Sequence, residues 1–414
     1  MLAPVRAPAA ATRAPSGDLG LLVALVLIGV ALRPQLGAVG PLIPRIQHEL
    51  GISHAVAGLL GTIPVLCMGL FAFFAAGIAR RLGTARAVGL ALLLTAVAGV
   101  LRVVVPDAWE VLLLTVPVGI GIAVGGTLMP VAVRELLPGR TGTGTGAYAG
   151  GMNVGSASAP ALAVPLAVWL GGWRESLAAL AVAGGVRTVG WFALTARAAA
   201  GARARGEAAP AATPRAPLPL RSPMAWVCCG VFGLMGVSFY GLAAWLPDSL
   251  QEHGWGEASS GYVLAVAMFA SVPVTMSVPK LAERVGSRRS WLVAGVTLNI
   301  VAVALYIEAP DLGWVWAAPL GASLGIEFTT LMSLPLDLGR GAARVAAAAG
   351  LILGVGYVIS AAGPFALGAA RDATGSYSTS LWIVCGSLAT VGLLSLPLTR
   401  ERLQRAAEAE AAHD

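Results

Sequence analysis

The side chains in this sequence that are most able to do chemistry are two charges set inside long apolar runs, Arg33 and Glu327. A charge in such surroundings must face protein, water or a ligand, because burying it unpaired is costly. The planar guanidinium of Arg33 offers a fork of donors that suits a small anion or a polarised nitrogen heterocycle. A carboxylate held out of water binds a proton more readily, so we predict that Glu327 is a proton-coupling residue.

Both residues also have simpler interpretations. Arg33 could extend to a polar surface or cap a helix that breaks at Pro34, and Glu327 could only hydrogen-bond a neighbouring helix. If both runs are helices that cross the same layer, the two charges differ in depth by about 10 Å at 1.5 Å per residue. They are therefore not expected to pair directly, although a substrate could lie between them.

Four further polar residues in apolar runs, Tyr148, Asn153, Tyr240 and Tyr357, could hydrogen-bond a substrate or only a neighbouring helix. The single lysine, Lys280, is not part of a phosphate-binding loop, so ATP hydrolysis is not expected. The cysteines lack zinc spacing, and the histidines are expected in loops or in the C-terminal tail. We therefore predict no metal site and no cofactor, and since no catalytic set stands out, we predict that the protein is not an enzyme.

The elements that position these residues follow from the composition of the chain. Hydrophobic residues make up 57% and charged residues 11% of the sequence, whereas soluble domains carry about 25% charged residues. Backbone groups in hydrocarbon must pair internally, and apolar runs of about 20 residues do so as helices. We therefore predict an all-α membrane protein. Its twelve transmembrane helices are expected near residues 20–39, 55–79, 86–105, 110–133, 143–168, 175–196, 224–247, 259–280, 289–308, 313–335, 345–369 and 378–398.

The second half of the sequence weakly repeats the first, about 203 residues further on. The recurring positions include Pro44, Glu49 and Gly51, which return as Pro247, Glu252 and Gly254. Duplication in so apolar a chain is typical of two related six-helix bundles. The expected organisation is a cytoplasmic tail at 1–19, one bundle at 20–196, a cytoplasmic linker at 197–223, the second bundle at 224–398 and a cytoplasmic tail at 399–414.

The distribution of charge predicts the orientation. If both termini are cytoplasmic, most of the 27 Lys and Arg residues fall in the tails, the linker and the inner loops, and acids gather in the outer loops. We therefore expect a multi-pass protein of the bacterial inner membrane. The net charge of +7 is spread over loops that meet anionic lipid, so no nucleic-acid partner is expected. The first apolar run is long enough to span and is interpreted as an uncleaved helix.

Two short loops resemble the G-x-L-A-D-R-x-G loop of the major facilitator superfamily. The matching residues are Arg80, Arg81 and Gly83 in the first loop, and Glu283, Arg284 and Gly286 in the second. The resemblance implies that they are gating loops, whose ion pairs form and break as the two bundles rock. Arg80 stands where that motif has an acid, and the alternative is that these arginines only set the topology.

Longer motifs are similar to the cyanate and 2-nitroimidazole transporter (CynX/NimT) family over nearly the whole chain. They are Leu32-Arg33-Pro34, residues 57–67, Gly172-Trp173-Arg174, Tyr240 with Trp245-Leu246-Pro247, and Gly356-Tyr357 with Gly363-Pro364. Leu353 and Gly126 stand where the family pattern has a glutamine and an asparagine. The resemblance implies a secondary active transporter in which spans one, four, seven and ten line a central cavity. The implied substrate is a small polar or anionic solute, either a cyanate-like anion or a nitroimidazole-like heterocycle, moved by alternating access.

The alternative class is a membrane receptor or sensor that binds a small ligand without moving it. Sensors normally carry a signalling domain, and the sequence shows only short tails beyond its spans, which favours transport. The expected partners are a small-molecule substrate, the lipid bilayer and protons, and the expected oligomeric state is a monomer.

Overall fold

The computed structural model describes residues 16–137, 139–204, 216–282, 287–339 and 341–412, and all of the regular elements in these segments are helices. The elements are α1 (Ser16–Leu32), α2 (Pro34–Gly37), α3 (Val39–Leu50), α4 (His54–Leu82), α5 (Thr84–Val104), α6 (Ala108–Leu136), α7 (Thr141–Leu170), α8 (Trp173–Ala204), α9 (Pro223–Glu252), α10 (Glu257–Ala282), α11 (Arg288–Glu308), the 3₁₀ turn η1 (Pro310–Leu312), α12 (Gly313–Leu338), α13 (Ala342–Ser360), α14 (Ala362–Thr374), α15 (Tyr377–Ser395) and α16 (Arg400–Ala412).

Eleven segments of the described chain are long and apolar enough to cross a membrane. The helices α1 to α3 together form one of them, Leu19–Leu50, and α13 with α14 forms another, Ala343–Thr374. The helix α12 is not among the eleven, but it has 26 residues and packs along α10 and α11 inside the bundle. With α12 as the tenth crossing, the twelve predicted transmembrane helices are all present.

The first crossing is longer than the predicted 20–39 and is broken near its middle. Arg33 separates α1 from α2, because Pro34 has no backbone N–H to donate to the preceding helical turn. After the short α2 and Ala38, the chain continues as the helix α3. The crossing ends at Gly51, whose φ of 62° favours glycine. The eleventh crossing is interrupted in the same way at Ala361, just before Gly363 and Pro364.

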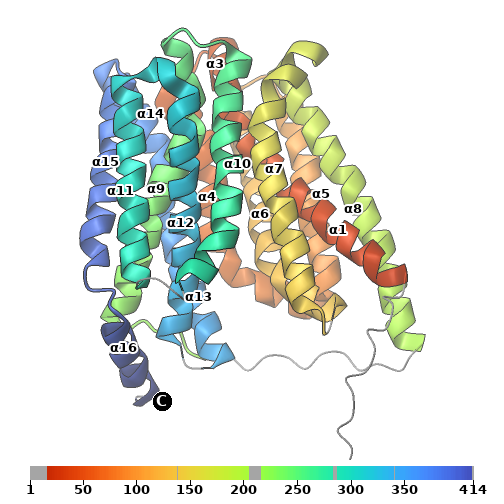
Figure 1. Cartoon of the computed structure of the whole chain (residues 1–414). Helices are drawn as coiled ribbons and strands as arrows, with labels where there is room; N and C mark the ends of the chain where they lie inside the picture. The colour runs from red at the N-terminus through yellow and green to blue at the C-terminus, as the bar shows by residue number, and fades with distance from the viewer. Residues whose placement is uncertain (1–15, 138, 205–215, 283–286, 340, 413–414) are drawn as a thin grey trace, which may run out of the picture.

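The helices form two bundles that stand side by side in Figure 1, one from α1 to α8 and the other from α9 to α15. Between the bundles, α4 packs against α13 and α14, α7 packs against α10, and α3 packs against α9. The end of α8, the start of α9 and the helix α16 lie at one end of the molecule (Figure 1). We call this end the terminal face and the opposite end, where α3 and the start of α4 lie, the far face.

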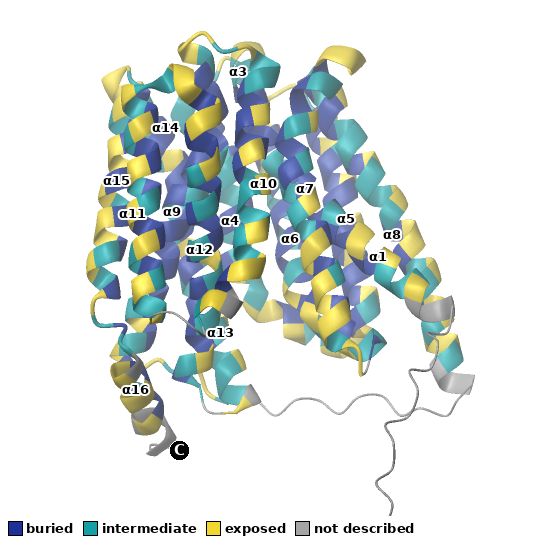
Figure 2. Cartoon of the chain, viewed as in Figure 1, coloured by how far each residue is buried: buried dark blue, intermediate teal, exposed yellow. Residues whose placement is uncertain are grey.

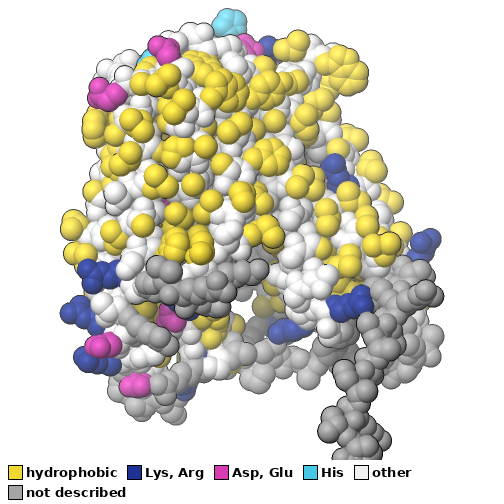
Figure 3. All heavy atoms as spheres, viewed as in Figure 1, with side chains coloured by type: hydrophobic (Ala, Val, Ile, Leu, Met, Phe, Trp, Pro, Cys, Tyr) yellow, Lys and Arg dark blue, Asp and Glu magenta, His cyan; other side chains and the backbone are white. Residues whose placement is uncertain are grey.

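The outward surface of the bundles is apolar. Large hydrophobic side chains such as Phe74, Leu113, Val315 and Leu393 are exposed, whereas the helix faces that meet inside each bundle are buried (Figure 2). Figure 3 shows hydrophobic side chains over the body of the molecule, with most of the visible Lys and Arg residues toward the terminal face. An apolar belt between two polar ends is the surface that a bilayer requires.

The two bundles touch most closely near the far face, through glycines. A side chain on Gly58 of α4 would lie 2.5 Å from the carbonyl oxygen of Pro364, and one on Gly40 of α3 would lie 2.2 Å from that of Ala243. Gly261 of α10 approaches the Pro160 carbonyl of α7 in the same way. Because these neighbours are backbone atoms, which cannot move aside cheaply, glycine is needed for the bundles to close here.

Candidate functional site

A cavity of about 140 Å³ lies between the two bundles and contains both charges singled out in the sequence, Arg33 and Glu327. Its walls come from the break between α1 and α2 and from α7, α9, α10, α12 and α13. Asn153, Tyr240 and Tyr357 also line it. The predicted residues therefore meet at one place, with the exception of Tyr148, which lies close behind Arg33.

Arg33 is placed by the break in the first crossing. It is the residue before α2, and its side chain forms no capping hydrogen bond, so the capping interpretation is not supported. Instead the guanidinium donates a hydrogen bond to the hydroxyl of Tyr240 and lies near Tyr357 and Tyr148. It is half-buried and lines the cavity, so it does not extend to the far surface as the other alternative required.

The surroundings of Arg33 hold no described carboxylate. The groups that act on its charge are the three tyrosines, and Tyr240 also shares a hydrogen bond with Tyr357. Tyrosine hydroxyls can accept hydrogen bonds from a guanidinium, but as neutral groups they do not balance its charge. Arg33 is therefore a cation without a directly paired carboxylate among the described residues, which favours an anionic or electron-rich ligand.

Glu327 of α12 lines the same cavity and is buried, with only 2% of its surface exposed. Its Oε1 accepts a hydrogen bond of 3.0 Å from Nδ2 of Asn299 in α11. The simpler interpretation of Glu327, a bond to a neighbouring helix, therefore describes a real contact, but the residue lines the cavity as well. Asn299 was not singled out from the sequence, although an asparagine in the apolar run 289–308 was the available signal.

A second, smaller cavity of about 60 Å³ lies between the first one and the far face. It shares five lining residues with the larger cavity, namely Arg33, Ser156, Phe239, Tyr240 and Met268, and most of its remaining wall is apolar. These five residues border both spaces. A solute that passed from one cavity to the other would therefore pass these shared residues, which include Arg33.

The helix break that carries Arg33 is held from behind by a second buried arginine, Arg102 of α5. Its Nη2 donates to the backbone oxygen of Gln35 at 3.0 Å and to Gln35 Oε1 at 2.9 Å. Gln35 in turn donates to the carbonyl of Leu177 in α8. From the sequence, Arg102 is only an arginine in the last turn of a predicted helix, within reach of a polar surface, so its buried position could not be foreseen.

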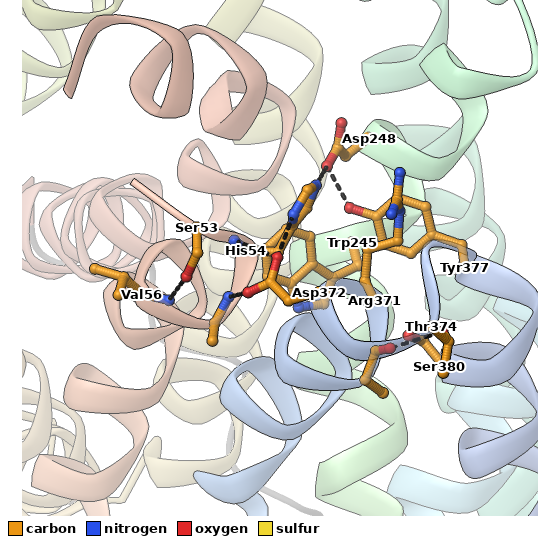
Figure 4. Close-up of polar contacts among 12 residues, drawn as sticks. Ser53, His54, Val56, Trp245, Asp248, Arg371, Asp372, Thr374, Tyr377 and Ser380 are labelled. Atoms are coloured by element: carbon orange, nitrogen blue, oxygen red, sulfur yellow. Dashed lines mark hydrogen bonds and ion pairs between the residues drawn. The ribbon is translucent and has the colours of Figure 1, made fainter. Parts of the chain in front are cut away.

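A cluster of polar residues joins the bundles at the far face, around His54 at the start of α4 (Figure 4). The carboxylate of Asp372 in α14 accepts hydrogen bonds from the backbone N–H groups of His54 and Ala55 at 3.0 and 2.8 Å, and it lies 2.7 Å from His54 Nδ1. On its other side His54 lies 3.8 Å from Asp248, which accepts a hydrogen bond from the Tyr377 hydroxyl. His54 was expected as a solvated loop residue, but it is part of the contact between the bundles.

Further contacts between the bundles lie near this cluster. Arg45 of α3 forms an ion pair of 2.6 Å with Glu257 of α10. The Thr62 hydroxyl of α4 donates to the carbonyl of Ala361 and accepts from the backbone N–H of Phe365. Together with the glycine contacts, these interactions close the far face above the two cavities.

The predicted gating loops lie at the other end of the molecule. Gly83 ends α4 with a φ of 82°, and Arg80 and Arg81 are exposed just before it. Glu283, Arg284 and Gly286 lie outside the described residues. The gating role of both loops stays a prediction.

The described residues contain no group of three or more His, Cys, Asp or Glu side chains that could hold a metal ion. The four cysteines are free and buried in the helices. The larger cavity combines one cation, one carboxyl group and several aromatic rings, which suits it to binding a small solute.

Comparisons with known proteins agree with this geometry. A sequence model of the Major Facilitator Superfamily matches residues 19–364. The chain is 29% identical over 388 residues to the cyanate transport protein CynX of Escherichia coli, which covers 91% of this chain and 96% of that protein. It is 29% identical over 371 residues to the 2-nitroimidazole transporter of the same organism, with coverages of 87% and 90%. The chain is also 28% identical to an uncharacterized transporter of Bacillus subtilis, YycB, in an alignment that covers 92% of this chain and 94% of that protein.

Solved structures show the same fold. A mutant of the nucleoside transporter NupG aligns with a TM-score of 0.73 at 12% identity, covering 92% of this chain and 100% of that one. A D-xylose-proton symporter aligns with a TM-score of 0.67 at 15% identity, covering 91% and 96%. Both resemblances predicted from the sequence are confirmed by these matches, as is the fold of twelve helices in two bundles.

Proposed function

We propose that this chain, which belongs to the major facilitator superfamily, is a secondary active transporter for a small anionic or weakly acidic solute. The observation that carries the proposal is Arg33, a cation without a carboxylate partner on a cavity between the two bundles. In this superfamily architecture, rocking of the bundles exposes such a midplane site to one side of the membrane at a time. The relatives reported above are named as transporters, and nothing favours the alternative of a receptor.

The lining of the cavity supports a planar heterocycle over a bare triatomic anion. Arg33 and Tyr240 provide polar groups. Phe232, Phe239 and Phe328 provide aromatic surface, and Met235 and Met268 also line the cavity. Aromatic rings gain from stacking on flat ligands, and thioethers adapt to their outline. One relative is named for cyanate and the other for 2-nitroimidazole. Both solutes should be tested, and we expect the heterocycle to bind more tightly.

The same proposal includes the orientation of the protein in the membrane and its oligomeric state. The positive charge of the tails and linker supports a cytoplasmic terminal face and a far face toward the outside of a bacterial inner membrane. The described state is then closed to the outside. Since both walls of the cavity come from one chain, a monomer suffices, and we assign no enzymatic step to it. Asn153, which lines the cavity, is proposed to orient the solute directly, and Tyr148 is proposed to act on it through Arg33.

The role of Arg33 can be tested by binding and transport. Arg33→Ala should abolish solute-dependent thermal stabilisation of the purified protein and counterflow in proteoliposomes. Arg33→Lys should recover little of either, because a point charge does not replace a planar fork of donors. Arg187→Ala is the matched control, since Arg187 lies in α8, which does not line the cavity. Full counterflow by Arg33→Ala would refute the proposed site.

Glu327 is proposed to carry the coupling proton. It is the acidic residue on the cavity, and its neutral mimic can be made by a single substitution. Glu327→Gln should keep counterflow but lose accumulation driven by an imposed pH gradient, because the amide resembles a permanently protonated carboxyl group. If this variant still concentrates solute in response to the gradient, Glu327 is not the coupling residue and exchange or facilitated diffusion is the better account.

A further inference from the structure

Asn299 lies directly behind Glu327, on the side away from the cavity. It belongs to α11, which contributes no residue to the cavity wall, and it is completely buried. Its Nδ2 donates to Glu327 Oε1, while its Oδ1 is buried without a hydrogen-bond partner. The acceptor oxygen of this amide is thus unused, next to a carboxyl group.

The contact between these residues is built into the packing of α11 on α12. One turn before Asn299, Gly295 meets α12 so closely that a side chain there would lie 3.0 Å from Ile326 Cγ2 and 3.1 Å from Glu327 Cγ. Glycine at this position lets the two helices approach at the level of Glu327. The amide of Asn299 is therefore held against the carboxyl group from one side, with the cavity on the other.

The unused oxygen has a specific partner in one protonation state of Glu327. An ionised carboxylate only accepts hydrogen bonds, which matches the Nδ2 donor. A protonated carboxyl group also donates, and a half-turn of the amide about its terminal torsion brings Oδ1 to the position now held by Nδ2. The one side chain can thus satisfy either form, whereas an apolar residue would satisfy neither.

We propose that Asn299 is a positioning residue that pairs with Glu327 in both protonation states and sets the pH at which the transporter takes up and releases its proton. This inference rests on the proposed coupling role of Glu327. The other described titratable groups on the same cavity are Arg33, Tyr240 and Tyr357, and none of them bonds to Glu327. Asn299 is therefore the polar contact through which the protein can tune this carboxyl group.

The test replaces Asn299 by leucine, which has a similar size and no hydrogen-bonding group. The ionised form loses a stronger bond than the protonated form, so the midpoint of pH-gradient-driven accumulation should rise by about one pH unit. Counterflow at saturating 2-nitroimidazole should persist at pH values below the new midpoint. Asn299→Ser, which keeps a donor and an acceptor on a shorter side chain, should recover part of the shift and provides a second variant if leucine disturbs folding.

A spectroscopic measurement separates a hydrogen bond from a packing effect. The carbonyl stretching band of protonated Glu327 can be identified by infrared difference spectroscopy as the band that disappears in Glu327→Gln. We expect this band to move to the higher frequency of an unbonded carboxyl group in Asn299→Leu and to stay near its original position in Asn299→Ser. An unchanged band and an unchanged midpoint in Asn299→Leu would overturn the inference even if Glu327→Gln loses accumulation. Accumulation that persists in Glu327→Gln would instead refute the coupling role itself.

Discussion

Asp372→Ala should release the contact that closes the far face. The carboxylate accepts two backbone hydrogen bonds at the start of α4 and contacts His54 Nδ1, so three interactions between the bundles end on one side chain. A hydrogen bond to a charged group contributes about 1.5–3 kcal/mol, but Asp372 is 29% exposed and water replaces part of each bond when the face opens. We therefore expect a net loss of about 2 kcal/mol for the closed state, which is about a thirtyfold shift toward the open one.

The shift can be measured with a cysteine placed in the smaller cavity. Ala243 lines this space, and the four native cysteines are buried, so Ala243→Cys provides a target for a membrane-impermeant thiol reagent added from outside. The labelling rate should rise about thirtyfold when Asp372→Ala is added. Glu49→Ala is the matched control, because Glu49 pairs with Arg174 on the same face but within one bundle. Equal labelling rates with and without Asp372, or an equal rise with Glu49→Ala, would refute the assignment.

Two further predictions follow from the packing and from the distribution of charge. Gly58→Ala should also raise the labelling of Cys at position 243 and slow transport, because the new methyl group would meet the Pro364 backbone at 2.5 Å. Gly386→Ala in α15, where a methyl group meets nothing within 4 Å, should change neither. A reporter fused within 197–223 should be cytoplasmic and one fused near His253 should be periplasmic, and the opposite result at either position would contradict the proposed orientation.

The sequence indicated several residues of the candidate site one by one. Arg33 and Glu327 could be identified because a charge inside an apolar run is costly unless it faces protein, water or a ligand. Both line the central cavity. Tyr240, Tyr357 and Asn153 were also visible as polar residues in apolar runs. That these residues surround one cavity could not be predicted, because they come from different helices. An apolar run shows that a helix crosses the membrane, but it does not show which side of that helix faces its neighbours.

Contacts between distant helices were missed for the same reason. Asp372 and His54 are 318 positions apart, and both looked like solvated residues at the ends of spans. Arg102 looked like an ordinary arginine near a helix end until the structure placed it against Gln35. The break at Ala361 was also missed, although Gly363 and Pro364 were there to suggest it.

The amino-acid sequence by itself determined the solvent and the class of fold. A chain this poor in charge must face lipid, lipid requires helices with internally paired backbones, and the repeat requires two similar bundles. Only the tertiary structure decided which side chains share a cavity, which amide stands behind Glu327 and which face is closed. Those facts depend on how each helix is rotated and how closely it approaches its neighbours. In a membrane protein, small residues and polar pairs at the helix interfaces decide the packing, because apolar residues cover both the lipid-facing and the buried sides of each helix.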